Sequence, residues 1–354
     1  MASKYKFILL LALSTLLCTS CSSDDTNYQP INDVSVDLDL VPYAKLSDYN
    51  LFAGNLSDLI PSAELLLYRP HSELFVDYAH KSRYVWMPKG TKATFVSEND
   101  PLQLPVGSIL IKNLFYDAQQ LGNKRNTETR LMINTNDGWI FANYVWNEAQ
   151  TEAYYDTNGG TIPLTLQHNT ESLALNYMIP STGQCINCHS KQEEIVPIGI
   201  KPIHLNNSLN GNNQLQQWIE KDFLENNLPQ SINAVVDYTD TSASLNERVR
   251  AYFDIQCAYC HNDDGAAYYV PLRMNYHQTV DPYNMGVCMR SAMPVDGITR
   301  DFAIDPQNPP NSTLLAMMNT NNPMFKMPRI GRSTIHQEGV ALIEAWIDSL
   351  EPCE

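Results

Sequence analysis

The sequence predicts an α+β protein of several domains, in which an antiparallel β-sandwich-like domain precedes an irregular module and an all-α domain. Length is one reason, because 354 residues leave room for more than one core. The second reason is a change in residue composition and spacing along the chain. Runs of β-branched and aromatic residues fill the first half, whereas helical spacing of apolar residues is clearest near the C-terminus.

The β-rich domain is expected over residues 46–175, where strand-like runs alternate with turn signals. Asn136-Asp137-Gly138 lies between two of these runs and indicates a hairpin, and Asn158-Gly159-Gly160 is a second such signal. The runs are rich in Val, Ile, Tyr and Trp, which are typical of strands. They are residues 83–87, 108–112, 130–134 and 139–146.

Two helices are predicted in the last domain, residues 233–354. Ser244 and Glu247 fit a capping box at the start of a helix that runs directly into Cys257. Residues 336–350 again place apolar side chains at helical spacing. The other elements expected after the β-rich domain are an irregular module at 176–232, a helix at 213–224 and a linker at 229–241.

The N-terminus carries the features of an export signal. Basic Lys4 and Lys6 precede an apolar run at residues 7–17, which is too short to span a bilayer. Small residues directly before Cys21 are similar to a bacterial lipoprotein processing site, although Cys18 replaces the usual aliphatic residue three places earlier.

We therefore expect a signal peptide at residues 1–20, a lipid on Cys21 and a flexible polar tether at 21–45. These features predict an outer-membrane lipoprotein of a Gram-negative bacterium, facing the periplasm or the cell surface. Its contact with the membrane would be the lipid anchor.

The charge balance is acidic, with 39 Asp plus Glu against 23 Lys plus Arg and a formal net charge of -16. A field of this sign repels nucleic acid and anionic membrane and favours basic protein partners. We therefore expect redox partner proteins of the envelope and no nucleic acid.

Two copies of the motif Cys-x-x-Cys-His carry the most specific chemical signal. Haem c is held by thioether bonds from both cysteines, and the histidine that follows is the proximal iron ligand. Zinc also binds Cys-x-x-Cys pairs, but here each pair is followed by His in an exported chain. A thioredoxin-like site would need a βαβ context. We therefore expect two covalent haem c groups, at Cys185-Ile-Asn-Cys188-His189 and Cys257-Ala-Tyr-Cys260-His261.

Met327 is the expected sixth ligand of the second haem. It precedes Pro328 and the last predicted helix, which is where a c-type ligand loop lies, and a thioether ligand raises the reduction potential. Many methionines only pack in cores. The competing methionines are Met274, Met293 and Met324.

The distal side of the first haem is left open by the sequence. His80, His168, His204 and Met178 are the candidates, and a vacant position is equally compatible. An open iron binds small ligands, whereas a six-coordinate iron mostly passes electrons.

The remaining cysteines, after Cys18, Cys21 and the two motifs are set aside, are Cys288 and Cys353. Two spare cysteines in an oxidising compartment suggest a disulfide.

Several segments together resemble a group of bacterial diheme c-type cytochromes that have no established substrate. The likeness covers residues 60–350. It implies a β-rich region before the first haem motif, a cytochrome c domain around the second, haem at both motifs and electron transfer. The segments are residues 74–85, 144–148, 184–189, 257–262 and 327–333.

Three functions are compatible with these features. Electron transfer is the one we favour, with a carrier more expected than a catalyst. The alternative is a haem-dependent oxidoreductase, peroxidase-like or a substrate oxidase, with an open first haem. A third is a β domain that captures a glycan or a protein.

Six further residues bear on these alternatives. In the oxidoreductase, four residues of the β-rich domain would line the site, although such residues are more often core or rim. They are Arg130, Trp139, Tyr144 and Trp146. Arg329 and Arg332 would contact haem propionates.

Overall fold

The computed structural model describes residues 33–192, 194–291 and 293–354, so the predicted signal peptide and Cys21 lie outside the described residues. The chain from Asp33 to Glu354 forms one compact unit. Its elements are, in chain order, η1 (Leu46–Tyr49), β1 (Phe52–Ala53), η2 (Leu56–Asp58), β2 (Ile60–Pro61), β3 (Leu66–Leu67), β4 (His80–Trp86), β5 (Ile109–Tyr116), α2 (Ala118–Leu121), β6 (Arg125–Thr135), β7 (Gly138–Trp146), β8 (Ala153–Tyr155), β9 (Gly160–His168), β10 (Glu171–Ile179), α3 (Thr182–His189), β11 (Ser190–Lys191), β12 (Glu194–Ile195), α4 (Pro202–Leu205), β13 (Ser208–Leu209), β14 (Asn212–Asn213), α5 (Gln214–Glu220), α6 (Leu245–Gln256), η3 (Pro282–Met285), η4 (Pro309–Asn311), α7 (Thr313–Met318) and α8 (Gln337–Asp348).

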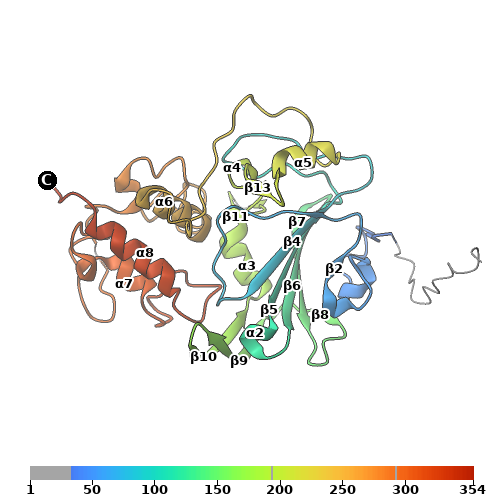
Figure 1. The fold of residues 1–354 in the computed structure, drawn as a ribbon, viewed down its shortest axis with the longest axis horizontal. Coiled ribbons are helices and arrows are strands. Elements are labelled where there is room, and N and C mark those ends of the chain that lie inside the picture. The colour runs from blue at the N-terminus through green and yellow to red at the C-terminus, as the bar shows by residue number, and fades with distance from the viewer. Residues whose placement is uncertain (1–32, 193, 292) are drawn as a thin grey trace, which may run out of the picture. The chain divides into compact units, whose positions relative to one another are not determined.

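A six-stranded antiparallel sheet, β3-β4-β5-β6-β7-β8, is the main element of the β-rich region (Figure 1). Neighbouring strands in the sheet also follow one another in the chain, although long segments connect β3 to β4 and β4 to β5, and α2 lies between β5 and β6. The predicted β6–β7 hairpin is confirmed, because Thr135 pairs with Gly138 across a two-residue turn and Gly138 has a φ of 102°. The mixed helix and antiparallel-sheet content agrees with the predicted α+β class.

The second layer of the predicted β-sandwich is smaller than expected. It is the two-stranded hairpin β9–β10, whose Leu166 and Tyr177 pack against Leu114 and Tyr116 of β5. The turn of this hairpin follows His168, which pairs with Glu171.

The turn predicted at residues 158–160 instead leads into β9. A Cβ at Gly159 would lie 2.5 Å from the carbonyl oxygen of Ile179, so this glycine allows a close approach of two backbones.

One face of the six-stranded sheet packs against the N-terminal segment. Side chains such as Ile111, Leu131 and Tyr144 form a core with Leu46 and Tyr49. The predicted flexible tether does not extend to residue 45, because alternating apolar residues after Asp33 pack against this core. They are Val34, Val36, Leu38, Val41 and Tyr43.

The opposite face of the sheet packs against the irregular module. Leu110 and Met132 contribute to a core with Leu215 and Trp218 of α5. The helix predicted at 213–224 is thus α5, which ends earlier, at Glu220.

In the C-terminal part, α6, α7 and α8 pack around a shared core, and the long segment between α6 and α7 contains only the short helices η3 and η4. Ser244 caps α6 as predicted: its hydroxyl accepts from the backbone N–H of Glu247 at 3.3 Å and lies 2.6 Å from the Glu247 carboxylate. The helix then ends at Gln256, directly before Cys257. Cys288 and Cys353 are joined by a disulfide with an S–S distance of 2.08 Å.

The predicted linker at 229–241 packs against the preceding module. The backbone N–H of Val235 donates to the carbonyl of Ile203 at 3.0 Å, and the Ser72 hydroxyl donates to the carbonyl of Val236 at 2.8 Å. Among the described residues, no helix combines the length and apolar character needed to cross a membrane.

Candidate haem sites

The first motif lies on the short helix α3. Ser181 caps this helix by accepting from the N–H of Gln184, and the Gln184 side chain accepts from the N–H of Ser181 at 2.9 Å. The cap starts the helix close to the motif, so that Cys185 and Cys188 lie one turn apart and His189 ends the helix. This spacing is what attachment of one haem at two cysteines requires.

The ring of His189 is held in one orientation. Its Nδ1 lies 2.9 Å from the carbonyl oxygen of Val196, and because a carbonyl can only accept, Nδ1 carries the proton. The ring packs edge-on against Phe141, with 5.2 Å between centroids. Burial lowers the pKa of His189 to about 4. The neutral ring therefore leaves Nε2 as the atom available to a metal, the arrangement in which proteins hold ligating histidines.

The second motif follows α6 in a tight turn. The N–H of His261 donates to the carbonyl of Cys257 at 3.0 Å, so Cys257, Cys260 and His261 also lie within one turn. Burial lowers the pKa of His261 to about 4. In contrast to His189, its Nδ1 is buried without a hydrogen-bond partner among the described residues.

The two motifs meet, although they are far apart in the sequence. The thiols of Cys188 and Cys260 lie within hydrogen-bonding reach of each other, and the Cys260 thiol donates to the carbonyl of Asn187 at 3.4 Å. Beside them, the Gln192 side chain donates to the carboxylate of Asp264 at 2.7 Å. Cys188 of the first motif and Cys260 of the second motif therefore lie next to each other.

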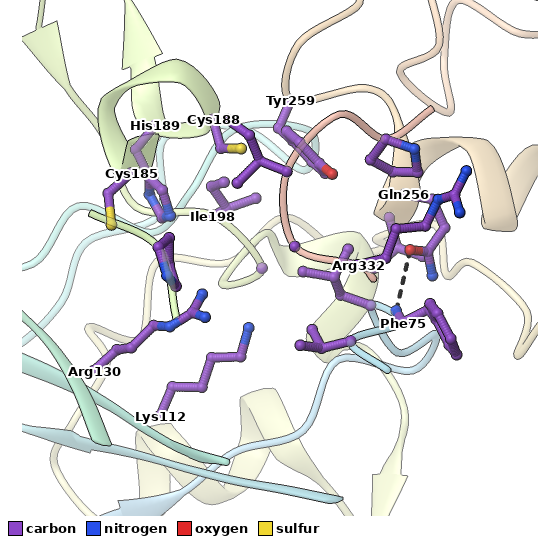
Figure 2. Close-up of a pocket in the computed structure, with 18 of the residues that line it drawn as sticks. Phe75, Lys112, Arg130, Cys185, Cys188, His189, Ile198, Gln256, Tyr259 and Arg332 are labelled. Atoms are coloured by element: carbon purple, nitrogen blue, oxygen red, sulfur yellow. Dashed lines mark hydrogen bonds between the residues drawn. The ribbon is translucent and has the colours of Figure 1, made fainter. Parts of the chain in front are cut away.

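A cavity opens between the sheet, α3 and the C-terminal helices (Figure 2). Its empty space, including the open mouth, is about 1470 Å³. The residues that line the cavity come from three parts of the chain, namely the sheet, α3 and the C-terminal part. They are Lys112, Arg130, Phe141 and Asn143 from the sheet, Cys185, Cys188 and His189 from α3, and Tyr252, Gln256, Tyr259, Met327, Arg332 and His336 from the C-terminal part.

This cavity fits a haem at the first motif. Both cysteines and the oriented His189 border it, and apolar and cationic side chains share its walls. Of the second motif, Tyr259 lies on the wall, whereas Cys257, Cys260 and His261 do not.

Met327 lies in the loop between α7 and α8, on the wall of this cavity. Its N–H donates to the carbonyl of Met317 at 2.8 Å. Met327 therefore lines the cavity that Cys185, Cys188 and His189 of the first motif and Tyr259 of the second also line. Of the competing methionines, Met274 is buried in the helical core, whereas Met293 and Met324 are exposed.

Arg332 supports the Met327 loop. Its buried guanidinium donates to a set of backbone carbonyls, including those of Met327 at 3.1 Å and Thr320 at 2.8 Å, and to the side chain of Asn321. The guanidinium N–H groups of Arg332, which we expected to contact haem propionates, are therefore used in these hydrogen bonds. Arg329, the other expected contact, is exposed.

None of the four candidates for the distal side of the first haem is among the described residues that line this cavity. His80 is half-exposed and pairs with Asp117 at 3.1 Å, and His168 lies 3.3 Å from Glu338. Met178 lies in β10, and His204 lines a second cavity.

Of the four residues proposed to line an oxidoreductase site, only Arg130 reaches the cavity. Arg130 pairs with Asn143, whereas Tyr144 pairs with Thr129, so Tyr144 and Trp146 point to the opposite face and lie in its core. Trp139 packs in the core beside the cavity.

His336 is a cavity residue that sequence reasoning missed. It precedes α8, stacks on Phe75 with 4.2 Å between centroids, and its Nδ1 lies 3.1 Å from the Tyr252 hydroxyl. Burial lowers its pKa to about 4. The sequence signal was only its position at the start of a predicted helix.

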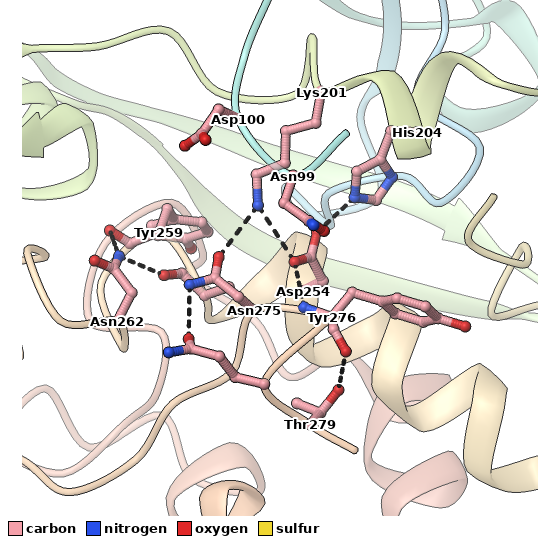
Figure 3. A network of polar contacts seen from close by, with 12 residues as sticks. Asn99, Asp100, Lys201, His204, Asp254, Tyr259, Asn262, Asn275, Tyr276 and Thr279 are labelled. Carbon is pink, nitrogen blue, oxygen red and sulfur yellow. Dashed lines mark hydrogen bonds and ion pairs between the residues drawn. The ribbon is translucent and has the colours of Figure 1, made fainter. Parts of the chain in front are cut away.

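The second cavity contains a buried ionic network that joins the module to α6 (Figure 3). The carboxylate of Asp254 lies 2.6 Å from Nε2 of His204 and 3.3 Å from Nζ of Lys201, and it accepts from the N–H of Tyr276 at 2.8 Å. Burial raises the pKa of Asp254, but Lys201 and His204 outweigh burial and hold the pKa below its ordinary value.

Comparison with known proteins finds no matching family, no similar curated protein and no similar solved structure. Within the part of the chain that the structure describes, no three Cys, His, Asp or Glu side chains converge as they would around a bound metal ion.

Proposed function

We propose that this protein is a diheme c-type cytochrome that transfers electrons in the bacterial cell envelope. The meeting of the two motifs carries the proposal, because Cys188 and Cys260 would attach two haems side by side. Electron transfer between cofactors slows steeply with distance, so adjacent attachment suits a relay. Haem iron, when bound, alternates between ferrous and ferric states and passes one electron at a time.

The residues of each motif have distinct roles in this proposal. Cys185 and Cys188 hold the first haem and His189 presents Nε2, oriented through Val196. Cys257 and Cys260 hold the second haem, with His261 as its proximal ligand.

Met327 is the proposed sixth ligand of the second haem. In support, it shares the cavity wall with Tyr252, Gln256 and Tyr259, which belong to the helix and turn of the second motif. Residues 233–354 would then be an all-α cytochrome c domain, in keeping with an α6 helix that runs into the motif and packs in one core with α8.

The location of the relay is part of the proposal. A lipid on Cys21 would anchor the chain to the outer membrane, and the acidic surface would attract basic redox proteins.

A second candidate is a haem-dependent oxidoreductase with an open first haem, peroxidase-like or a substrate oxidase. The observation that favours it is that His80, His168, His204 and Met178 all lie off the wall that His189 lines.

The test is to produce the full chain with haem c maturation and to count covalent haems. We expect two per chain, and one after either pair of substitutions, C185A with C188A or C257A with C260A. The control C288S with C353S keeps two. Absence of covalent haem in the wild type would exclude both candidates.

Carbon monoxide separates the two candidates. An electron carrier with two six-coordinate haems leaves the reduced spectrum unchanged, whereas an open first haem binds carbon monoxide with a stoichiometry of one.

A further inference from the structure

A row of four polar side chains crosses the floor of the larger cavity. Arg83 of β4 pairs with Lys112 of β5, Lys112 with Arg130 of β6, and Arg130 with Asn143 of β7. Residues directly opposite one another in a sheet point to the same face, so the four side chains are neighbours. All four line the cavity that Cys185, Cys188 and His189 also line.

Positive charge in this row exceeds the negative charge that pairs with it. Arg130 is paired with the buried Glu128 at 2.5 and 2.9 Å. Arg83 lies 3.9 Å from Glu73, which also pairs with Lys81 at 3.5 Å and with Arg69 at 2.8 Å. With Lys112 included, the cations around these two carboxylates outnumber them.

Lys112 has no ion-pair or hydrogen-bond partner among the residues that the structure describes. Burial holds its pKa well below the ordinary value, and the neighbouring charges of Arg130 and Arg83 lower it further. A buried ammonium group without a counter-ion is costly, so an anion beside it would stabilise it.

Asn143 is the second unsatisfied group of the row. Only 4% of the residue is exposed, and neither Nδ2 nor Oδ1 has a partner in the described chain. A buried amide in this state costs about 1–3 kcal/mol, which a ligand in the cavity would relieve.

We propose that Lys112, Arg130 and Asn143 bind the carboxylates of the haem attached at Cys185 and Cys188. Lys112 and Arg130 point from the sheet into the space below Cys185 and His189 (Figure 2). Haem carries two propionate carboxylates, which would supply negative charge beside this excess of cations, and Arg and Lys are the side chains that bind carboxylates best. The inference rests on haem attachment at the first motif.

A free small carboxylate or oxyanion has the same chemistry and is the other source of such a ligand. The two sources can be distinguished by titration. A haem carboxylate is present in every haem-loaded molecule, whereas occupancy by a free anion rises with the concentration of that anion until it saturates.

The experiment measures the two reduction potentials of the full chain loaded with both haems. In Lys112→Met, we expect one potential to shift to more negative values and the other to stay, because loss of a nearby cation favours the ferric state. Lys112→Arg should retain the wild-type potentials. The matched control is Lys89→Met, since Lys89 is exposed and is not one of the described residues that line the cavity.

Asn143→Asp is the second variant, for the case that Lys112→Met does not fold. It keeps the size of the side chain and adds a negative charge, so it should shift the same potential in the same direction. Unchanged potentials in whichever variants retain two haems would overturn the proposal.

Titration of the wild type with acetate and with nitrite at constant ionic strength distinguishes the two sources. We expect no saturable change in potential or spectrum. A saturable change that is lost in Lys112→Met would assign the row to a free anion and overturn the haem assignment. Failure of the proposed function has a different signature, because the wild type would then lack covalent haem at the first motif.

Discussion

The carboxylate of Asp77 accepts two contacts from the backbone N–H of Ser333, at 2.8 and 2.9 Å, and one from its hydroxyl at 2.8 Å. It also accepts from the N–H of Thr334 at 3.0 Å. Asp77 precedes β4, whereas Ser333 lies in the loop that carries Met327. The β-rich region thus holds the loop from which the proposed iron ligand comes.

Substitution of Asp77 by Asn is expected to lower the free energy of unfolding by about 1–3 kcal/mol, since buried N–H groups lose an ionised acceptor. Asn tolerates the left-handed backbone of Asp77, whose φ is 46°, so strain adds little. Chemical denaturation measures the change, and Asp39→Asn is the exposed control. Equal midpoints for both variants and the wild type would contradict the role of Asp77.

Removal of the Met327 thioether tests its ligation directly. Met327→Ala should lower one reduction potential and leave that haem open to carbon monoxide, and Met327→His should lower the potential while keeping six ligands. Met324→Ala is the control, because Met324 is exposed. If Met327→Ala keeps both potentials, another residue is the ligand.

The strands could be predicted because their signals are local. Arg83 to Trp86 and the runs in β5, β6 and β7 combine β-branched and aromatic residues with turn chemistry at their ends. The helix caps at Ser181 and Ser244 depend on neighbours three residues away, and the second of these was predicted.

The cavity could not be predicted, because register across strands creates it. Lys112, Arg130 and Asn143 become neighbours only through pairing of β5, β6 and β7, and a one-residue slip would turn each to the other face. For the same reason Tyr144 looked like a partner of Arg130 in the sequence and lies on the opposite face.

The ion pair between Asp254 and His204 gives a prediction about the contact between α6 and the irregular module at residues 176–232. Asp254→Asn removes the charge that pairs with His204 and Lys201, and breaking a buried pair typically costs about 3–5 kcal/mol. Because the pKa of Asp254 is lowered in the folded state, its stabilisation is present above the ordinary aspartate pKa and is lost as pH falls below it. The measurement is urea denaturation at pH 7 and under acid conditions.

The control for this contact is Asp348→Asn, an exposed aspartate of α8. If Asp254→Asn loses no more stability than this control, the ionic network around Asp254 does not stabilise the contact between the module and α6.

The buried His336 predicts a dependence of stability on pH. Its pKa is about 4 when folded and about 6.5 when unfolded, so the unfolded chain binds the proton more tightly between these values. The stabilisation is therefore complete above pH 6.5 and is lost as pH falls toward 4, with a total on the order of 3 kcal/mol.

His336→Gln should remove this part of the pH dependence, because glutamine does not titrate. Free energies of unfolding for both proteins across this pH range measure it, with His80→Gln as the half-exposed control. Parallel pH profiles for the wild type and His336→Gln would contradict the assignment.

The contact between Cys188 and Cys260 predicts how the chain reacts before haem is attached. The proximity of the two thiols lowers the pKa of the Cys188 thiol and raises the pKa of the Cys260 thiol, so Cys188 is the better nucleophile at neutral pH. A mild oxidant should therefore join Cys188 to Cys260 in the haem-free chain, a bond that would block both motifs. Peptide mapping detects the cross-link. Cross-links within one motif, Cys185 to Cys188 or Cys257 to Cys260, would show instead that the two motifs do not meet before haem binds.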